Sequence, residues 1–328
     1  MTISSRAIGA AAAAALLVPL AGCASGAPES GPIPAPKPTS SSSAAGSTEP
    51  TPTAPHSQGV DPGAYPTYVA LGDSFTAAPL ASKTDPGDGC LRSRHNYPAL
   101  IAAAMAGTKL DDRSCAGADT TSLIGVQNTP QGVVPAQFDA LATDTSLVTV
   151  GIGGNDFGIY GTLIGTCPGL RASDPTGSPC QDQLTAGGTD QLLAEVAKLG
   201  PRLTSTIAGI RDRSPDAEIV VVGYPSAIAA GSTCPDLLPL ADGDYAYAAR
   251  INAALAETQK RAAKKADALY IDTFAASEGH DICSPDPWVN GQVTSADTAL
   301  AFHPLLAEQR AVAQLVLRAL PPHGVVGG

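Results

Sequence analysis

The chain after residue 63 alternates short apolar runs with longer amphipathic stretches. The short runs are rich in β-branched residues and bounded by Gly, Pro or Asp, a pattern that predicts strands. They cover residues 68–71, 109–111, 147–152, 218–222 and 268–271. Strands that alternate with helices are typical of a parallel sheet with helices on both faces. We therefore predict a three-layer α/β/α fold around a central, mostly parallel five-stranded sheet.

The clearest helix lies between the third and fourth predicted strands. From Leu192 to Ile210, apolar residues recur every three or four positions and form one stripe that can pack on a sheet. Gly200-Pro201 is expected to kink this helix. Further helices are predicted at 97–106, 244–265 and 305–320.

The first 63 residues have a different composition from the rest. Arg6 precedes an apolar run at 7–20 that is too short to span a bilayer, the pattern of an export signal. The run ends in Leu20-Ala21-Gly22-Cys23, which resembles a bacterial lipobox, so we expect residues 1–22 to be a lipoprotein signal peptide and Cys23 to carry a lipid anchor. Ordinary cleavage and release is the alternative.

Residues 23–63 are rich in Pro, Ser, Thr, Ala and Gly, and too poor in large apolar side chains to offset the entropy of ordering. We expect them to form a disordered tether. One domain is expected at 64–322, with a tail at 323–328.

Composition narrows the possible functions. The 328 residues contain 44% hydrophobic residues, enough for a buried core, and a net charge of −11, which repels a nucleic-acid backbone. Nucleic-acid binding is therefore not expected. Setting Cys23 aside leaves six of the seven cysteines, enough for three disulfides in an oxidising compartment, with 15 possible connectivities.

Chemically active residue types follow the predicted strands. In an open parallel sheet, ligands bind beyond the carboxyl ends of the strands. Ser74 follows the first strand, Gly117 the second, Asn155 the third, and His303 comes well after the fifth. We expect these four segments to meet at one edge of the sheet.

This set of residues suits acyl transfer. A serine at a strand-to-helix turn becomes a nucleophile when a neutral imidazole removes its proton, and His303 is the best-placed histidine. The expected oxyanion donors are the backbone N–H groups of Ser74 and Gly117 and the side-chain amide of Asn155. His280 and His95 are the alternative bases. No metal or organic cofactor is expected, since no His/Asp/Glu cluster has ligand spacing.

The sequence resembles the GDSL or SGNH hydrolase family, whose fold is flavodoxin-like. The resemblance is carried by Gly72-Asp73-Ser74-Phe75, by Gly117, and by Gly153-Gly154-Asn155-Asp156, with Phe75 in place of the usual leucine. It implies that Ser74 is the nucleophile and that Gly117 and Asn155 are oxyanion donors.

The cysteines are similar to those of secreted actinobacterial lipases in this family. That similarity implies sequential pairing of Cys90 with Cys115, Cys167 with Cys180, and Cys234 with Cys283.

The last block departs from the family pattern. The family usually has Asp-x-x-His, but Leu300 stands three residues before His303. The imidazole is then oriented either by a backbone carbonyl near Leu300 or by Asp297.

The sequence offers more than one candidate for the residues that line the pocket. Trp288 either lines the acyl pocket or anchors a loop. Tyr160 and the loop to Cys180 can form the opposite side of the pocket. Asp156 is expected to hold its own loop in place.

We expect a monomeric, secreted esterase or lipase that acts on acyl-ester lipids or small esters. With 4% aromatic residues, a sugar-stacking platform and hence a carbohydrate O-deacetylase is less favoured. A non-catalytic, envelope-binding lipoprotein is the alternative from another class.

Overall fold

The computed structural model describes residues 63–87 and 89–321, which belong to one compact unit, Ala54–Gly328. The predicted signal peptide at 1–22, Cys23, the tether at 23–63 except Gly63, and the tail at 323–328 lie outside the described residues and stay predictions. Within the described part, none of the helices combines the length and apolar character needed to cross a bilayer.

The predicted sheet is confirmed. Its five strands are all parallel and lie in the order β2-β1-β5-β6-β7. They are β1 (Thr67–Gly72), β2 (Lys109–Asp112), β5 (Leu147–Gly151), β6 (Glu218–Val222) and β7 (Leu269–Ile271). Because all five point the same way, the loops after β1, β2, β5 and β6 leave from one edge.

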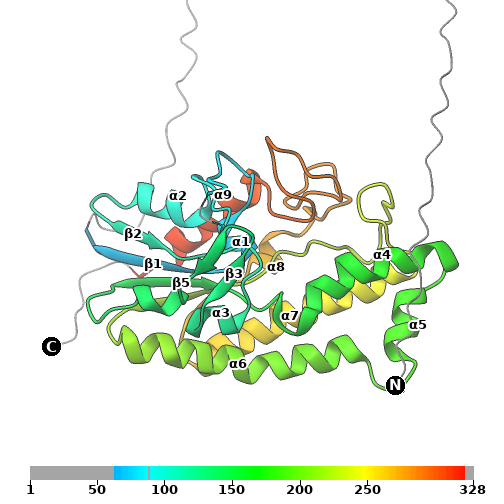
Figure 1. Cartoon of the computed structure of the whole chain (residues 1–328), viewed down its shortest axis with the longest axis horizontal. Coiled ribbons are helices and arrows are strands. Elements are labelled where there is room, and N and C mark those ends of the chain that lie inside the picture. The colour runs from blue at the N-terminus through cyan, green and yellow to red at the C-terminus, as the bar shows by residue number, and fades with distance from the viewer. Residues whose placement is uncertain (1–62, 88, 322–328) are drawn as a thin grey trace, which may run out of the picture. The chain divides into compact units, whose positions relative to one another are not determined.

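Helices cover both faces of the sheet (Figure 1). On one face lie α2 (Tyr97–Ala104) and α9 (Leu306–Ala319), and on the other α6 (Gln191–Arg213) and α7 (Asp244–Lys265). The predicted α/β/α layering is thus confirmed. The helix expected at 192–210 continues through Pro201 as one element.

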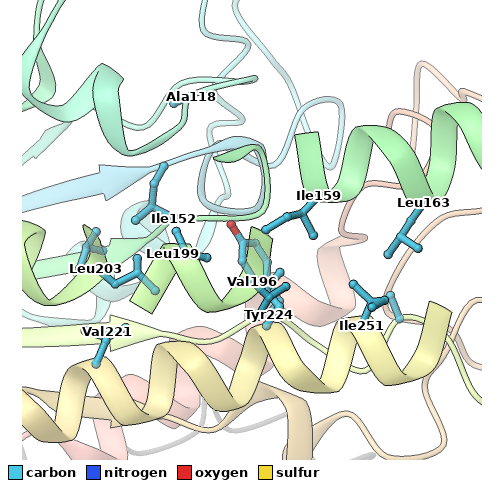
Figure 2. Packing of buried hydrophobic residues seen from close by; sticks show 14 of the residues in the cluster. Ala118, Ile152, Ile159, Leu163, Val196, Leu199, Leu203, Val221, Tyr224 and Ile251 are labelled. Carbon is cyan, nitrogen blue, oxygen red and sulfur yellow. The ribbon is translucent and has the colours of Figure 1, made fainter. Parts of the chain in front are cut away.

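The two cores follow from the alternation of side chains along each strand. Val69 and Leu71 of β1 pack toward α6 and α7, whereas Tyr68 and Ala70 pack toward α2 and α9. The larger cluster is shown in Figure 2, where Leu199 and Leu203 of α6 and Ile251 of α7 lie in the same buried layer.

Short elements fill the connections between the main strands and helices. They are α1 (Ser74–Ala77), α3 (Thr120–Ile124), the antiparallel pair β3 (Gln127–Thr129) and β4 (Gly132–Val134), η1 (Gln137–Ala140), η2 (Asp156–Gly158), η3 (Gly161–Thr166), α4 (Cys167–Leu170), η4 (Arg171–Ser173), α5 (Pro179–Thr185) and α8 (Thr273–Ala276). Three disulfides join Cys90 to Cys115, Cys167 to Cys180 and Cys234 to Cys283, which confirms the sequential pairing.

Candidate active site

Ser74 is the first residue of α1, directly after β1. The side chain of Asp73 caps this turn by accepting the Phe75 N–H at 2.8 Å, and Ser74 itself is 7% exposed. Gly72 makes the sharp exit from the strand possible. A Cβ at Gly72 would lie 2.2 Å from Thr76 Oγ1 and 2.6 Å from the Gly151 carbonyl, so no side chain fits there.

His303 lies in the loop before α9, and its ring is held by the main chain. Nδ1 lies 2.7 Å from the Ala301 carbonyl oxygen. A carbonyl can only accept, so Nδ1 carries the proton and Nε2 presents a free lone pair. Burial lowers the pKa of His303 below 6.5, against the opposing effect of the Ala301 hydrogen bond. The imidazole is therefore neutral at pH 7 and suited to accept a proton.

The imidazole is oriented by a backbone carbonyl near Leu300, as the first alternative predicts, but the carbonyl is that of Ala301 and not that of Leu300 itself. The Leu300 carbonyl accepts the His303 backbone N–H at 3.2 Å and the Asn290 amide at 3.0 Å rather than the imidazole. Asp297 is exposed in the preceding loop. Phe302 adopts a left-handed φ of 60°, and at this turn the ring bonds to the carbonyl of Ala301, two residues back.

Ser74, His303 and Asn155 line one cavity of about 60 Å³. The chain thus brings three sequence-predicted residues from distant segments to one place. The rest of the lining is mostly apolar: Asp73, Phe75, Tyr160, Ile164, Ala227, Ile228, Ile282, Val289 and Phe302. The Phe75 ring lies 6.2 Å from the imidazole, centroid to centroid, at an interplanar angle of 26°.

Gly117 and Asn155 lie on adjoining loops. The Asn155 side-chain amide donates to the Ala118 carbonyl at 2.8 Å, and its second N–H is left for another acceptor. Gly117 has a left-handed φ of 79° and is exposed, outside the residues that line the cavity. Its loop is fixed by the disulfide at Cys115 and by Gln127, whose amide donates to the Ala116 carbonyl at 2.8 Å.

Asp156 connects the loops of Gly117 and Asn155 through hydrogen bonds, in addition to stabilising its own loop. Its buried carboxylate accepts the Thr120 N–H at 3.0 Å, the Thr120 hydroxyl, and Arg202 Nη1 at 3.2 Å. Arg202 also lies over the Phe157 ring, 4.4 Å from its centroid. The role of Arg202 was not predicted from the sequence, because a single arginine on an amphipathic helix is usually a solvent-exposed side chain.

Asp73 is the second residue whose environment the sequence did not reveal. It is 1% exposed, and burial raises its pKa to about 7, although hydrogen bonds from Tyr224 and Phe75 oppose the rise. The Tyr224 hydroxyl donates to Asp73 Oδ2. A carboxyl group with a near-neutral pKa therefore directly precedes Ser74 in the chain.

His280, His95 and Trp288 lie outside the cavity lining. His280 stacks on Trp288 at 4.7 Å between ring centroids, and its Nδ1 lies 2.7 Å from the Asp286 carbonyl. His95 is exposed. Tyr160 does line the cavity, and so does Val289, the neighbour of Trp288 in the chain. The described residues contain no group of three or more His, Cys, Asp or Glu side chains that could hold a metal ion.

Comparison with known proteins gives the family. Residues 70–309 match the GDSL-like lipase/acylhydrolase family. "Lipase 2" of Streptomyces coelicolor is 39% identical over 220 residues, which are 66% of this chain and 72% of the relative. A lipase of Streptomyces rimosus is 32% identical over 265 residues, 77% of this chain and 83% of the relative.

Solved structures agree with this result. The phospholipase A1 of Streptomyces albidoflavus NA297 superposes with a TM-score of 0.63 at 29% identity, over 78% of this chain and all of that one. The extracellular lipase of S. rimosus gives a TM-score of 0.64 at 26% identity, over 77% and 99% of the two chains. The chain belongs to the GDSL-like lipase/acylhydrolase family and is a carboxylic ester hydrolase.

Proposed function

We propose that this hydrolase cleaves carboxylic esters of acyl lipids through an acyl-Ser74 intermediate, with His303 as general base. The observation that carries the proposal is the single cavity lined by Ser74, His303 and Asn155. A hydroxyl, a neutral imidazole and an amide donor around one space are the groups that acyl transfer needs.

The first half of the reaction forms the acyl-enzyme. Nε2 of His303 takes the proton of the Ser74 hydroxyl as Oγ attacks the ester carbonyl carbon. The negative charge that develops on the carbonyl oxygen is met by the Ser74 N–H and the Asn155 amide, which line the cavity. The Gly117 N–H is the third donor of the proposal; Gly117 lies outside the lining, on the loop that Asn155 contacts through the Ala118 carbonyl. The C–O bond then breaks, and the alcohol leaves with the proton from His303.

The second half returns the enzyme to its starting state. His303 takes a proton from water, hydroxide adds to the acyl carbon, and the carboxylic acid leaves as Ser74 regains its proton. The Ala301 carbonyl accepts from Nδ1 throughout and stabilises the imidazolium that forms twice in the cycle.

The cavity wall supports an acyl substrate. Ile164, Ile228, Ile282 and Val289 offer apolar surface next to Ser74, and similar chains are named lipase and phospholipase A1. The proposal also includes export to the cell envelope and a lipid anchor at Cys23, and the support for both is the sequence of residues 1–23 alone.

Hydrolysis of p-nitrophenyl esters from acetate to palmitate tests the mechanism. We expect Ser74→Ala and His303→Ala to lower kcat by at least about 10³-fold. His280→Ala is the matched control, because its ring lies outside the cavity lining, and it should keep wild-type kcat. Wild-type turnover by Ser74→Ala would refute the mechanism. A sharp preference for acetate over longer chains would instead support a carbohydrate O-deacetylase.

A further inference from the structure

The hydroxyl of Tyr224 joins two loops of the active site. Tyr224 follows β6 and is 1% exposed. Its hydroxyl donates to Asp73 Oδ2 and accepts the Gly154 N–H at 2.8 Å. Asp73 directly precedes Ser74, and Gly154 directly precedes Asn155, so one oxygen atom connects the backbone beside the nucleophile to the backbone beside the oxyanion donor.

The direction of both hydrogen bonds is determined by chemistry. A phenol has one proton, and a backbone N–H can only donate, so the phenol proton must go to the carboxyl group of Asp73. The other oxygen of Asp73 accepts the Phe75 N–H at 2.8 Å. Each of the two carboxyl oxygens of Asp73 therefore accepts a hydrogen bond, one from Phe75 and the other from Tyr224.

Tyr224 is itself held firmly. Its backbone N–H donates to Gln259 Oε1 at 3.3 Å, and Gln259 Nε2 donates to the Ile152 carbonyl at 3.0 Å. The ring packs edge-to-face on Phe75 and on Tyr160, with centroids 5.2 Å apart in each pair. Figure 2 shows Tyr224 within the buried cluster, which also contains Val196 and Ile159. The hydroxyl can therefore act as a fixed reference point for both loops.

Gly154 is fitted closely to this arrangement. A Cβ at Gly154 would lie 3.1 Å from the Tyr224 hydroxyl and 2.3 Å from the Tyr160 ring. The backbone of the loop before Asn155 therefore packs directly against Tyr160 and Tyr224, with no room for a side chain at Gly154.

We propose that the Tyr224 hydroxyl is a positioning group, which sets the separation between the Ser74 nucleophile and the Asn155 oxyanion donor. The proposal rests on the roles given to those two residues under the proposed function. Tyr224 touches no reacting atom and acts through Asp73 and Gly154. Since a misplacement of about 1 Å can cost about 10²-fold in rate, loss of this link should lower turnover while substrate binding is kept.

Tyr224→Phe removes one oxygen atom and keeps the ring. The matched control is Tyr245→Phe. Tyr245 is also fully buried, in the first turn of α7. Its hydroxyl likewise accepts a backbone N–H, from Cys234 at 2.9 Å, and donates to a carbonyl, that of Leu238. Both variants lose a buried hydroxyl between two backbone segments, but only Tyr224 is linked to Asp73 and Gly154.

Steady-state kinetics on p-nitrophenyl butyrate and the rate of phosphonylation by a p-nitrophenyl phosphonate supply the readouts. We expect Tyr224→Phe to lower kcat and the phosphonylation rate by about 10- to 100-fold with KM within twofold of wild type. Tyr245→Phe should keep both rates and show a comparable fall in Tm. Wild-type rates in Tyr224→Phe, or a higher KM with unchanged kcat, would overturn the proposal.

Asp73→Asn provides a second route if Tyr224→Phe does not fold. An asparagine has one acceptor oxygen and one NH₂ group in place of the two carboxyl oxygens, so Phe75 and Tyr224 can no longer each donate to a separate oxygen, and kcat should fall as well. Wild-type kcat in Asp73→Asn would overturn the proposal. Ser74→Ala is measured in parallel: if it is inactive, the result bears on Tyr224 alone, and if it is active, the proposed function fails first.

Discussion

Glu308 is a buried acid that we expect to make the protein less stable as pH rises. It lies in the first turn of α9, is 3% exposed, and accepts the Gln309 amide at 2.6 Å. Among the described residues, no cation forms an ion pair with it. Burial raises its pKa from 4.5 to about 8, and the Gln309 hydrogen bond offsets only part of this rise.

The size of the effect follows from linkage. A rise of about 3.5 in pKa, at about 1.36 kcal/mol for each pKa unit, corresponds to about 5 kcal/mol. Between pH 4.5 and about 8 the folded state holds a proton that the unfolded state has released. The contribution of Glu308 to stability is therefore fully present below pH 4.5 and is lost as pH rises through about 8.

Glu308→Gln keeps the shape and the acceptor but cannot ionise. We expect the advantage of the variant over wild type to be small at pH 5, to grow with pH, and to reach several kcal/mol at pH 9, or about 10 °C in Tm. Urea unfolding at pH 5, 7 and 9 measures the difference in free energy of unfolding, with Glu257→Gln, which removes an exposed carboxylate, as the control. A Glu308→Gln difference from wild type that is the same at all three pH values would refute the reasoning.

Three further results are expected. Because burial lowers the pKa of His303, kcat/KM on a soluble ester should stay constant as pH is lowered, until the pH falls below 6.5. A loss of kcat/KM with its midpoint near pH 7 would instead indicate that Asp73 is the controlling group. Asn155→Ala should lower kcat by about 10²–10³-fold with KM little changed, and a loss under threefold would contradict its role as a donor. Gly154→Ala places a Cβ 2.3 Å from the Tyr160 ring, so both Tm and kcat should fall; unchanged values of both would show that this contact can relax.

The sheet was predictable from the chain because each strand carries its own signal. A run such as Glu218–Val222 is compact, β-branched and bounded by turn residues, and it matches β6 residue for residue. The position of Ser74 and Asn155 at one edge then follows from strands running in the same direction. The β3–β4 pair was not predicted, since Gln127–Thr129 is short and shows no apolar alternation.

The identity of most partners that support the site residues could not be predicted. Ala301 orients the imidazole because of a left-handed turn at Phe302, a backbone conformation without a sequence signature at that residue. Tyr224 meets Asp73 from 151 positions away along the chain. Hydrogen-bond partners of this kind depend on how two loops approach each other in space. Local propensity and periodicity in the sequence do not determine that approach.

The acyl-serine mechanism is tested most directly by covalent trapping. The wild-type protein is treated with a p-nitrophenyl phosphonate until esterase activity is lost, and the adduct is then located by peptide mass spectrometry. We predict one phosphonyl group per chain on Ser74, formed in step with the loss of activity, and no adduct in Ser74→Ala. Loss of activity with the label on another residue, or full activity after Ser74 is labelled, would contradict the mechanism.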